Sequence, residues 1–358
     1  MNTRVATILS PEDLGTAGTK VIDINIKDII SRITIAFKAT NVSEVMQEHP
    51  AANISKIELV DGSDVLFSLS GLQAQAINFY NRKNKPYSYI DDIAAHNQTA
   101  VMSIDFGRFL YDPELAFDPN KFVNPQLKIT WDEDACEVDC VVNECIVRAH
   151  IFDQKEVAPV GFLMTKEIYS YLVQTSGYEY IDLPTDHILH QLYVKARYAD
   201  TSFFGLMAEA KLSEDNDRRI PLDLTMTELL HDALEAYGYV MEHFYLNGVT
   251  SSTVFFAMPC DLEYIGWSPY GAKDAGAIWA TGGGKCRHIG TSASYNQKGM
   301  IVGALPHGVM PILPRPSEEI ADWYDVPALG SLRLRLKDTA SVADVATAEI
   351  ITQQFRKY

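Results

Sequence analysis

Two stretches of the chain, VLFSLSGLQ at residues 65–73 and IPLDLTMTE at residues 220–228, determine our prediction of the fold. In each, apolar side chains recur at every second position, and a hydroxyl residue then precedes Gln or Glu by three positions. The period of two predicts a strand with one buried face. The Ser/Thr-x-x-Gln/Glu spacing predicts a capped helix start. The same strand-to-helix unit therefore occurs twice, 155 residues apart.

Further segments repeat in the same order along the chain. The matched pairs are 21–24 with 180–183, 29–35 with 188–194, and 127–131 with 332–336, at offsets of 159, 159 and 205 residues. The last match extends to Glu144 and Glu349. Alternating patterns also match by chance between unrelated β proteins. The common order and the two capping boxes favour tandem duplication of one β unit.

The chain as a whole has an all-β pattern. Short alternating runs are separated by turn residues, which is typical of sandwiches and barrels. Helical periodicity is confined to Leu72–Tyr80, to Met226–Tyr237 before Gly238, and, more weakly, to Lys166–Val173. We therefore predict two tandem β units, each a sandwich or a barrel, with short flanking helices.

Length, charge and cysteine content narrow the functional class. The chain has 358 residues, enough for two domains, and a formal net charge of −17. Such acidity argues against sequence-specific binding of nucleic acid, which relies on Lys and Arg. The sequence has neither an apolar run long enough to span a membrane nor a signal-peptide pattern. With five cysteines in no framework spacing, it is expected to be made in the cytoplasm with reduced, buried thiols.

One segment differs in composition from the rest. Residues 258–316 hold ten of the 21 glycines, six prolines, and Trp267 and Trp279, and they carry a charge of +2. This segment explains why the repeat offset grows from 155 to 205 residues. Because long loops in compact domains are usually functional, it is either an excursion packed over the β unit or a contact surface.

Motifs for nucleotide binding and serine catalysis are incomplete. Gly282–Cys286 resembles a phosphate loop, but Trp279 stands where the first glycine belongs and Cys286 replaces the magnesium-binding hydroxyl. The segment Gly290–Ser294 lacks the second glycine of a nucleophile elbow. Both segments are interpreted as ordinary loops.

Metal and acid–base constellations are equally weak. Cys136, Cys140 and Cys145 lack the spacing of a zinc site and are expected to be buried fillers on a strand. The nine histidines, His187 and His190 among them, form no ligand motif, and acidic runs such as Asp215–Asp217 and Asp132–Asp134 fit solvated turns better than calcium loops. A pair of carboxylates for glycoside hydrolysis stays open, because its geometry is spatial. We name no catalytic, cofactor-binding or metal-ligating residue and no cofactor.

Five segments carry a family resemblance: AANISKIEL at 51–59, FDPNKF at 117–122, NPQLKI at 124–129, IDLP at 181–184 and DRRIP at 217–221. They resemble the double jelly-roll major capsid proteins of tailless icosahedral viruses, phages and related viruses. The resemblance spans most of the chain but consists of packing and turn patterns. It implies an all-β fold of two tandem eight-stranded jelly rolls with short flanking helices, and a structural protein without enzymatic activity. Three chains would form a pseudo-hexameric trimer that tiles the virion shell beside neighbouring capsomers, minor capsid or penton proteins, and in some viruses an internal membrane.

On this reading we expect an N-terminal arm at residues 1–20 that orders on contact with partners. Jelly roll one would cover 21–152, a connector with a helix 153–179, and jelly roll two 180–358, with an insertion at about 245–325. Two other functions stay open. One is a β-sandwich enzyme acting on glycans, supported by 18 Tyr and 4 Trp, and the other is a virion attachment protein that binds through the insertion.

Overall fold

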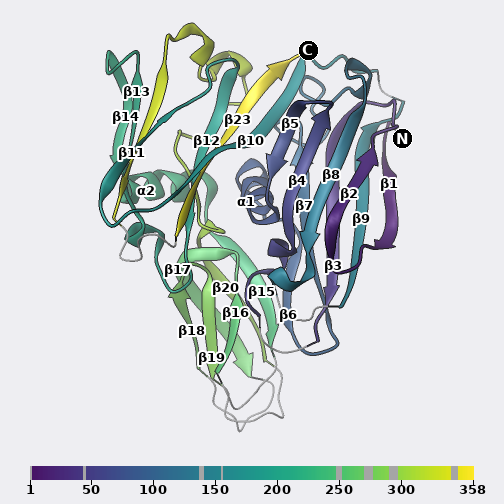
Figure 1. Cartoon of the computed structure of the whole chain (residues 1–358), viewed down its shortest axis with the longest axis vertical. Coiled ribbons are helices and arrows are strands. Elements are labelled where there is room, and N and C mark those ends of the chain that lie inside the picture. Colours follow the sequence, from purple (N-terminus) through teal and green to yellow (C-terminus); the bar gives the residue numbers. More distant parts are fainter. Residues whose placement is uncertain are drawn as a thin grey trace.

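Strands dominate the architecture (Figure 1). A computed structural model of the chain describes residues 2–42, 46–136, 141–154, 156–246, 252–269, 277–289, 297–339 and 346–358. Within these ranges there are two α-helices, α1 (Gly71–Arg82) and α2 (Met226–Tyr237). Neither helix is long and apolar enough to cross a bilayer.

The first jelly roll begins near the N-terminus. Its strands are β1 (Thr3–Asp13), β2 (Ala17–Asp23), β3 (Ile30–Thr40), β4 (Ile54–Asp61), β5 (Asp64–Leu69), β7 (Asn97–Asp105), β8 (Pro125–Asp132) and β9 (Val141–Phe152). One sheet has the order β1-β9-β3-β7 and the other β2-β8-β4-β5. When these eight strands are counted in chain order, the first sheet therefore consists of the first, eighth, third and sixth strands. It faces a sheet made of the second, seventh, fourth and fifth strands.

The second jelly roll repeats this topology. Its strands are β10 (Gly161–Leu172), β11 (Gly177–Asp182), β12 (Ile188–Arg197), β13 (Met207–Glu214), β14 (Arg219–Thr225), β21 (Val309–Pro311), β22 (Leu332–Asp338) and β23 (Thr347–Lys357). The sheet orders β10-β23-β12-β21 and β11-β22-β13-β14 are again first-eighth-third-sixth and second-seventh-fourth-fifth. The predicted duplication and fold class are therefore confirmed.

Every repeated block found in the sequence falls on equivalent strands. Residues 21–24 and 180–183 end the second strands, 29–35 and 188–194 enter the third strands, and the third block covers the seventh strands β8 and β22. Both predicted capping boxes are present, at Ser70 with Gln73 and at Thr225 with Glu228. Each helix therefore starts at the same point of its repeat.

One sheet runs continuously through both jelly rolls, and another joins the first jelly roll to the insertion. Strand β5 pairs in parallel with β10, and β6 (Ser88–Asp92) pairs in parallel with β15 (Val240–Leu246). The β2-β8-β4-β5 sheet thereby continues into the β10-β23-β12-β21 sheet, and the β1-β9-β3-β7 sheet continues through β6 into β15, a strand of the insertion. Between β5 and β10 the register sets Phe67 opposite Thr165 and Ser68 opposite Lys166.

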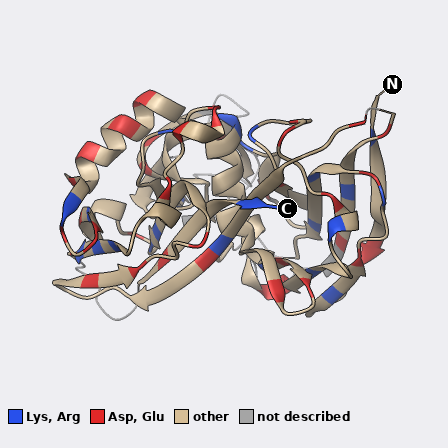
Figure 2. Ribbon diagram, turned by 90° about the horizontal axis from the view of Figure 1, so that it is seen from above, with Lys and Arg blue, Asp and Glu red and all other residues tan. Residues whose placement is uncertain are grey.

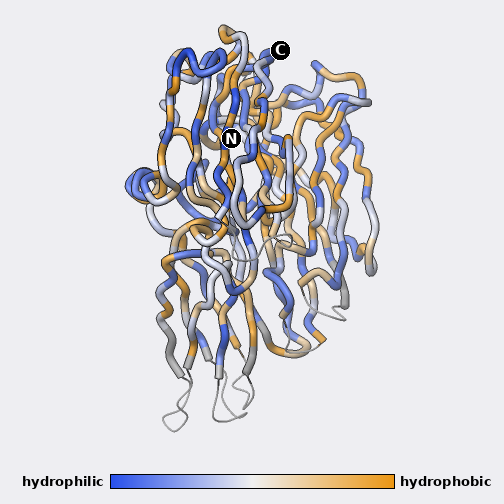
Figure 3. The backbone as a smooth tube through the Cα atoms, turned by 60° about the vertical axis from the view of Figure 1, so that its left-hand side comes forward, coloured by the Kyte–Doolittle hydropathy of each residue, from blue (hydrophilic) through white to orange (hydrophobic). Residues whose placement is uncertain are grey.

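Hydrophobic and hydrophilic residues alternate along the strands (Figure 3), and this alternation places the core between the two sheets of each unit. On β3, for example, Ile33, Ile35 and Phe37 are buried, while Thr34 and Lys38 on the opposite face are half-buried. Because apolar burial is the main driving force for folding, this period of two fixes which face of each strand points inward.

The insertion lies between α2 and β21. Its strands are β15, β16 (Ser252–Phe256), β17 (Pro259–Pro269), β18 (Ala277–Gly282), β19 (Lys285–Ile289) and β20 (Gln297–Pro306). It extends from the end of the molecule opposite both termini (Figure 1). The expected range, 245–325, starts after β15 has begun and includes β21, which belongs to the jelly roll itself.

Two segments that we expected to lie outside the strands are in fact strands, so both expectations are wrong. Residues 1–20, expected to be an arm, form β1 and the start of β2, which pair with β9 and β8 within the first jelly roll. Residues 166–173, predicted to be helical inside a connector, lie mostly on β10, which pairs with β23 over its whole length. Sheet pairing satisfies the backbone of both segments, and this long-range contact overrides their weak local patterns.

Candidate functional site

The glycine run joins the insertion to the second jelly roll. Gly282, Gly283 and Gly284 have positive φ angles and form the turn between β18 and β19. A Cβ atom on Gly283 would lie 2.1 Å from the carbonyl oxygen of Tyr198, and one on Gly284 would lie 2.5 Å from that of Ala257. Only glycine allows this backbone conformation together with such close approach. The turn is therefore an anchor packed against protein backbone.

Arg197, the last residue of β12, connects three parts of the chain. Its guanidinium donates to both carboxylate oxygens of Glu48, each at 2.6 Å, and to the carbonyl oxygen of Gly283 at 2.8 Å. Burial opposes the charged forms, but the attraction between the two groups outweighs it, so the pKa of Arg197 is raised and that of Glu48 is lowered. A planar fork on a carboxylate is a strong, directional contact. It fixes the first jelly roll, the second and the insertion relative to one another.

A second buried ionic contact fixes β15. Glu242 is completely buried, and its Oε1 lies 3.2 Å from His49 Nε2 and 3.4 Å from Lys85 Nζ. This carboxylate also accepts the hydroxyl of Ser88 and, at 2.7 Å, the amide of Met258. Burial disfavours its ionisation, but the interactions with His49 and Lys85 outweigh burial and hold the pKa of Glu242 well below its usual range.

His307 completes the same buried region. Its Nε2 lies 3.0 Å from Gln75 Oε1 on α1, and its ring is 4.6 Å from that of His49. Burial lowers the pKa of His307 well below its ordinary value, and His49 and Arg197 add to the effect. His307 is therefore neutral at pH 7.

Four of the five cysteines lie among the described residues. Cys136, Cys145, Cys260 and Cys286 are free and buried, whereas Cys140 lies outside the described residues. The prediction that Cys136 lies on a strand is wrong, because this residue directly follows a short 3-10 helix. Among the described residues, no group of three or more His, Cys, Asp or Glu side chains could hold a metal ion.

The other weak motifs are likewise accounted for, except the elbow-like segment 290–294, which lies outside the described residues. Asp215 accepts the amides of Gly330 and Ser331, and Asp217 pairs with Lys211 at 2.8 Å. These contacts lock the turn after β13 onto the loop that precedes β22. The acidic run is therefore a structural turn.

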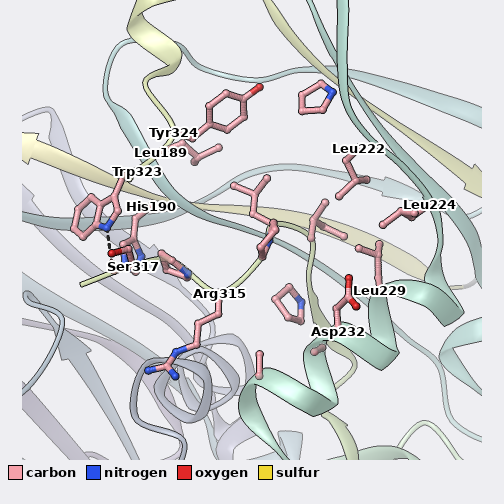
Figure 4. A pocket seen from close by; sticks show the side chains of 18 of the residues that line it. Leu189, His190, Leu222, Leu224, Leu229, Asp232, Arg315, Ser317, Trp323 and Tyr324 are labelled. Carbon is pink, nitrogen blue, oxygen red and sulfur yellow. Dashed lines mark hydrogen bonds between the residues drawn. The ribbon is translucent and has the colours of Figure 1, made fainter. Parts of the chain in front are cut away.

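A groove of about 870 Å³ lies between α2, the edge strand β14 and residues 311–325 (Figure 4). Leu222, Leu224 and Leu229 line its apolar wall, and Asp232 stands on the helix beside them. No sequence pattern predicted the groove, because residues 311–325 line it only as a result of tertiary packing.

Acidic and aromatic residues line the groove, and the aromatic side chains of Trp323 and Tyr324 are held by contacts within the protein. Trp323 is buried, donates its indole N–H to the carbonyl oxygen of Ser317 at 2.8 Å, and packs edge-on against His190 at 4.4 Å. Tyr324 donates its hydroxyl to Glu214. Burial lowers the pKa of His190 to about 4, which leaves it uncharged. These side chains hold the loop in place.

The fold is that of double jelly-roll capsid proteins. The chain is similar to the STIV MCP (TM-score 0.63, 10% identity, 99% of this chain and 98% of that chain). It is also similar to the major capsid protein P2 from bacteriophage PM2 (0.55, 12%, 99% and 98%) and to the PBCV-1 virus capsid (0.58, 9%, 99% and 93%). No protein-family model and no curated protein sequence matches the chain. The resemblance inferred from the sequence is thus confirmed for the fold.

Sequence reasoning missed the ionic contacts at the junction of the jelly rolls. One signal was present, because Glu242 occupies an inward position of the alternating strand between Val240 and Phe244. A charged residue at such a position requires a buried partner. The partner, His49, lies 193 positions away and could not be identified from the pattern.

Proposed function

We propose that the chain is a structural capsid subunit, without catalytic activity, that forms trimers in the shell of an icosahedral virion. The observation that carries this proposal is the tandem pair of jelly rolls, joined through one shared sheet, along the whole chain. Two similar units in one polypeptide allow three copies to make a six-unit ring, and closed cyclic assembly is the usual form of protein oligomers. The similar proteins named above are major capsid proteins or virus capsids.

We propose an orientation of the chain in the shell as well. The insertion and the two termini lie at opposite ends of the molecule (Figure 1), and in this proposal the insertion faces outward and the termini face the interior. The net charge of −17 suits a tile that leaves genome contacts to other components. Minor capsid proteins, penton proteins or an internal membrane would meet the inner face. The chain would be made in the host cytoplasm before assembly.

We divide the chain into two repeated units at residues 153–160, between β9 and β10. The test of the proposed function is size-exclusion chromatography with light scattering, followed by electron microscopy of the purified protein. We expect the mass of three chains and particles with a hexagonal outline. A monomer at every concentration would contradict the proposal.

A second candidate function, attachment of the virion through the insertion, rests on exposed apolar side chains there. Tyr264 on β17 is 69% exposed and Trp279 on β18 is 38% exposed; the side chain of Trp267 lies outside those described. Large exposed apolar residues mark interaction sites when they cluster. Replacing both residues by Ala would then abolish binding to host cells while leaving the trimer intact, and unchanged binding would exclude this candidate.

A further inference from the structure

The internal repeat allows the surfaces of one unit to be compared with the equivalent surfaces of the other. The comparison reveals surfaces that are covered in one unit and open in the other. Within the chain, the fifth strand of the first unit, β5, pairs in parallel with the first strand of the second unit, β10. The equivalent of β5 in the second unit is β14, which is the last strand of its sheet. The equivalent of β10 in the first unit is β1, which is also the last strand of its sheet. Within the described chain, the junction between β5 and β10 is formed. The equivalent strands β14 and β1, which could form a second junction of the same kind, are both unpaired on one side.

The helices that follow the fifth strands show the same contrast. On α1, Gln73, Ile77 and Tyr80 form one face, and all three are buried. This face meets the second unit, where Gln73 donates to Glu349 at 2.5 Å and Tyr80 to the carbonyl oxygen of Val309 at 2.6 Å.

The equivalent positions on α2, at an offset of 155, are Glu228, Asp232 and Glu235, and all three are exposed. In Figure 2, acidic segments in red follow one another along the helix at the left of the view. The covered face of the first repeat is therefore an open, acidic face in the second.

The first strands show the reverse contrast. Leu163 on β10 is 1% exposed, whereas Val5 on β1 is 51% exposed. The two residues are equivalent because Leu163 pairs with Phe355 on β23 and Val5 with His150 on β9, and these partners differ by the repeat offset of 205. The side of the second unit that rests on the first unit is thus covered, and the same side of the first unit is open.

We infer that β14 and α2 of one chain receive β1 and the outer face of the first jelly roll of a second copy, repeating the contact already made inside the chain. This inference rests on the proposed function and names the surface that builds the trimer. Transferring the Phe67–Thr165 pair by the repeat offsets places Leu222 opposite Thr7 of the next copy, in parallel. The groove beside α2 lies along this contact.

Charge at the open surfaces is complementary. Inside the chain, Gln73 contacts two carboxylates, Glu167 and Glu349, and Glu349 pairs with Lys195 at 2.8 Å. In the first unit, Glu144 and Lys38 replace Glu349 and Lys195 as opposed residues on β9 and β3.

No acid replaces Glu167. It stands opposite Ile351, and the equivalent partner, Ile146, faces the irregular stretch of β1 at Ser10 and Pro11. The second copy of the capping box carries Glu228 in place of Gln73, so an acid on α2 meets a surface that has lost one of its two acids and keeps Glu144 beside Lys38.

The unpaired charges point the same way. Lys38 and the exposed Arg148 on the open face of the first unit form no ion pair with any described residue. Neither do Asp232 and Glu235 on α2, within the same ranges. Opposite charges left unpaired on two surfaces favour their association and fix its register. Since each chain carries both surfaces, the contact is head-to-tail and generates a ring when it closes.

The test reverses charge on each side of the contact in the full chain. We expect Glu228→Lys or Lys38→Glu alone to raise the concentration at which the trimer dissociates by at least about tenfold, because like charges are then opposed. The double variant Glu228→Lys with Lys38→Glu should recover most of this loss. Glu228→Gln keeps the capping box, as Gln73 does in the first unit, and should have a smaller effect on the dissociation of the trimer.

Asp232→Lys lies outside the capping box and replaces Glu228→Lys in the test if that variant fails to fold. The control Glu156→Lys reverses an exposed acid between the units and should not change assembly.

Cross-linking checks the register directly. With Thr7→Cys and Asp223→Cys in the same chain, a short bis-maleimide should give covalent dimers and trimers, whereas either single variant and the wild type should stay single chains. Trimers that persist in both charge variants and give no cross-link would overturn this interface while leaving the proposed function intact. A wild-type chain that is monomeric at every concentration would instead overturn the proposed function.

Discussion

Replacing Arg197 by Met should destabilise the subunit strongly, and the structure sets the size of the effect. The guanidinium is 8% exposed and forms two bonds to Glu48, which is 26% exposed, and one to the carbonyl oxygen of Gly283. Methionine keeps much of the apolar stem but leaves a largely buried carboxylate without its partner. Breaking a buried ion pair in this way costs about 3–5 kcal/mol. Because Glu48 retains some contact with water, we expect about 3 kcal/mol.

The assay is urea denaturation of wild type and variant at pH 7, followed by tryptophan fluorescence. The double variant Arg197→Met with Glu48→Gln should cost less than the sum of the single variants, with a coupling of about 1–3 kcal/mol. The matched control is Arg333→Met, since Arg333 pairs with Asp182 at 2.7 Å but both side chains are exposed. It should cost at most about 1 kcal/mol. Equal losses for Arg197→Met and Arg333→Met would refute the reasoning.

Three further predictions concern packing, backbone and pH. Phe162→Ala should lower the free energy of unfolding by about 3–5 kcal/mol in the same assay, because the fully buried ring of Phe162 packs edge-on against Phe117 at 5.6 Å. The control Leu172→Ala, at the exposed end of the same strand, should lower it far less. Gly283→Ala should lower the melting temperature markedly, corresponding to about 2–4 kcal/mol, since its positive φ and the nearby Tyr198 carbonyl exclude a Cβ; a near-native melting temperature would contradict the anchoring role. The pKa of His307 is lower in the folded chain, so the unfolded chain takes up the proton first as pH falls below about 6.5 and stability drops. His307→Asn should flatten the dependence of the unfolding free energy on pH between about 7 and 5, and an unchanged slope would assign the effect elsewhere.

The repeat and both helices could be predicted because their signals are local. A strand followed by a capping box needs only nine consecutive residues, and both copies are intact at residues 65–73 and 220–228. The all-β class follows from alternation that the burial of side chains on β3, β8 and β22 reproduces. Local chemistry therefore fixed the class of fold and the order of its repeated parts.

Segments whose pairing is irregular could not be predicted. Strand β1 contains Pro11 and two shifts in register against β9, which break the period of two that would have revealed it. Strand β10 has its own shift between Glu167 and Tyr169, and this moved its apolar residues toward a helical spacing. Both strands are specified by their partners, which lie more than a hundred residues away.

The candidate site was inaccessible to sequence reasoning for a related physical reason. Its parts come from β14, α2 and the loop at 311–325, and none of them has an unusual composition. The surface became visible only when equivalent positions of the two repeats were compared, because Glu228, Asp232 and Glu235 are ordinary residues for the outside of a helix. Their significance lies in the burial of Gln73, Ile77 and Tyr80 at the same places.

The parallel pairings of β5 with β10 and of β6 with β15 have a mechanical consequence. Backbone hydrogen bonds cross from one sandwich to the other at β5 and β10, and from the first sandwich to the insertion at β6 and β15, so the chain has no soft hinge at its middle. In the proposed shell, curvature would therefore not come from folding each plate. The bend would be taken up at the seams between neighbouring trimers, where side chains rather than sheets would hold the pieces together.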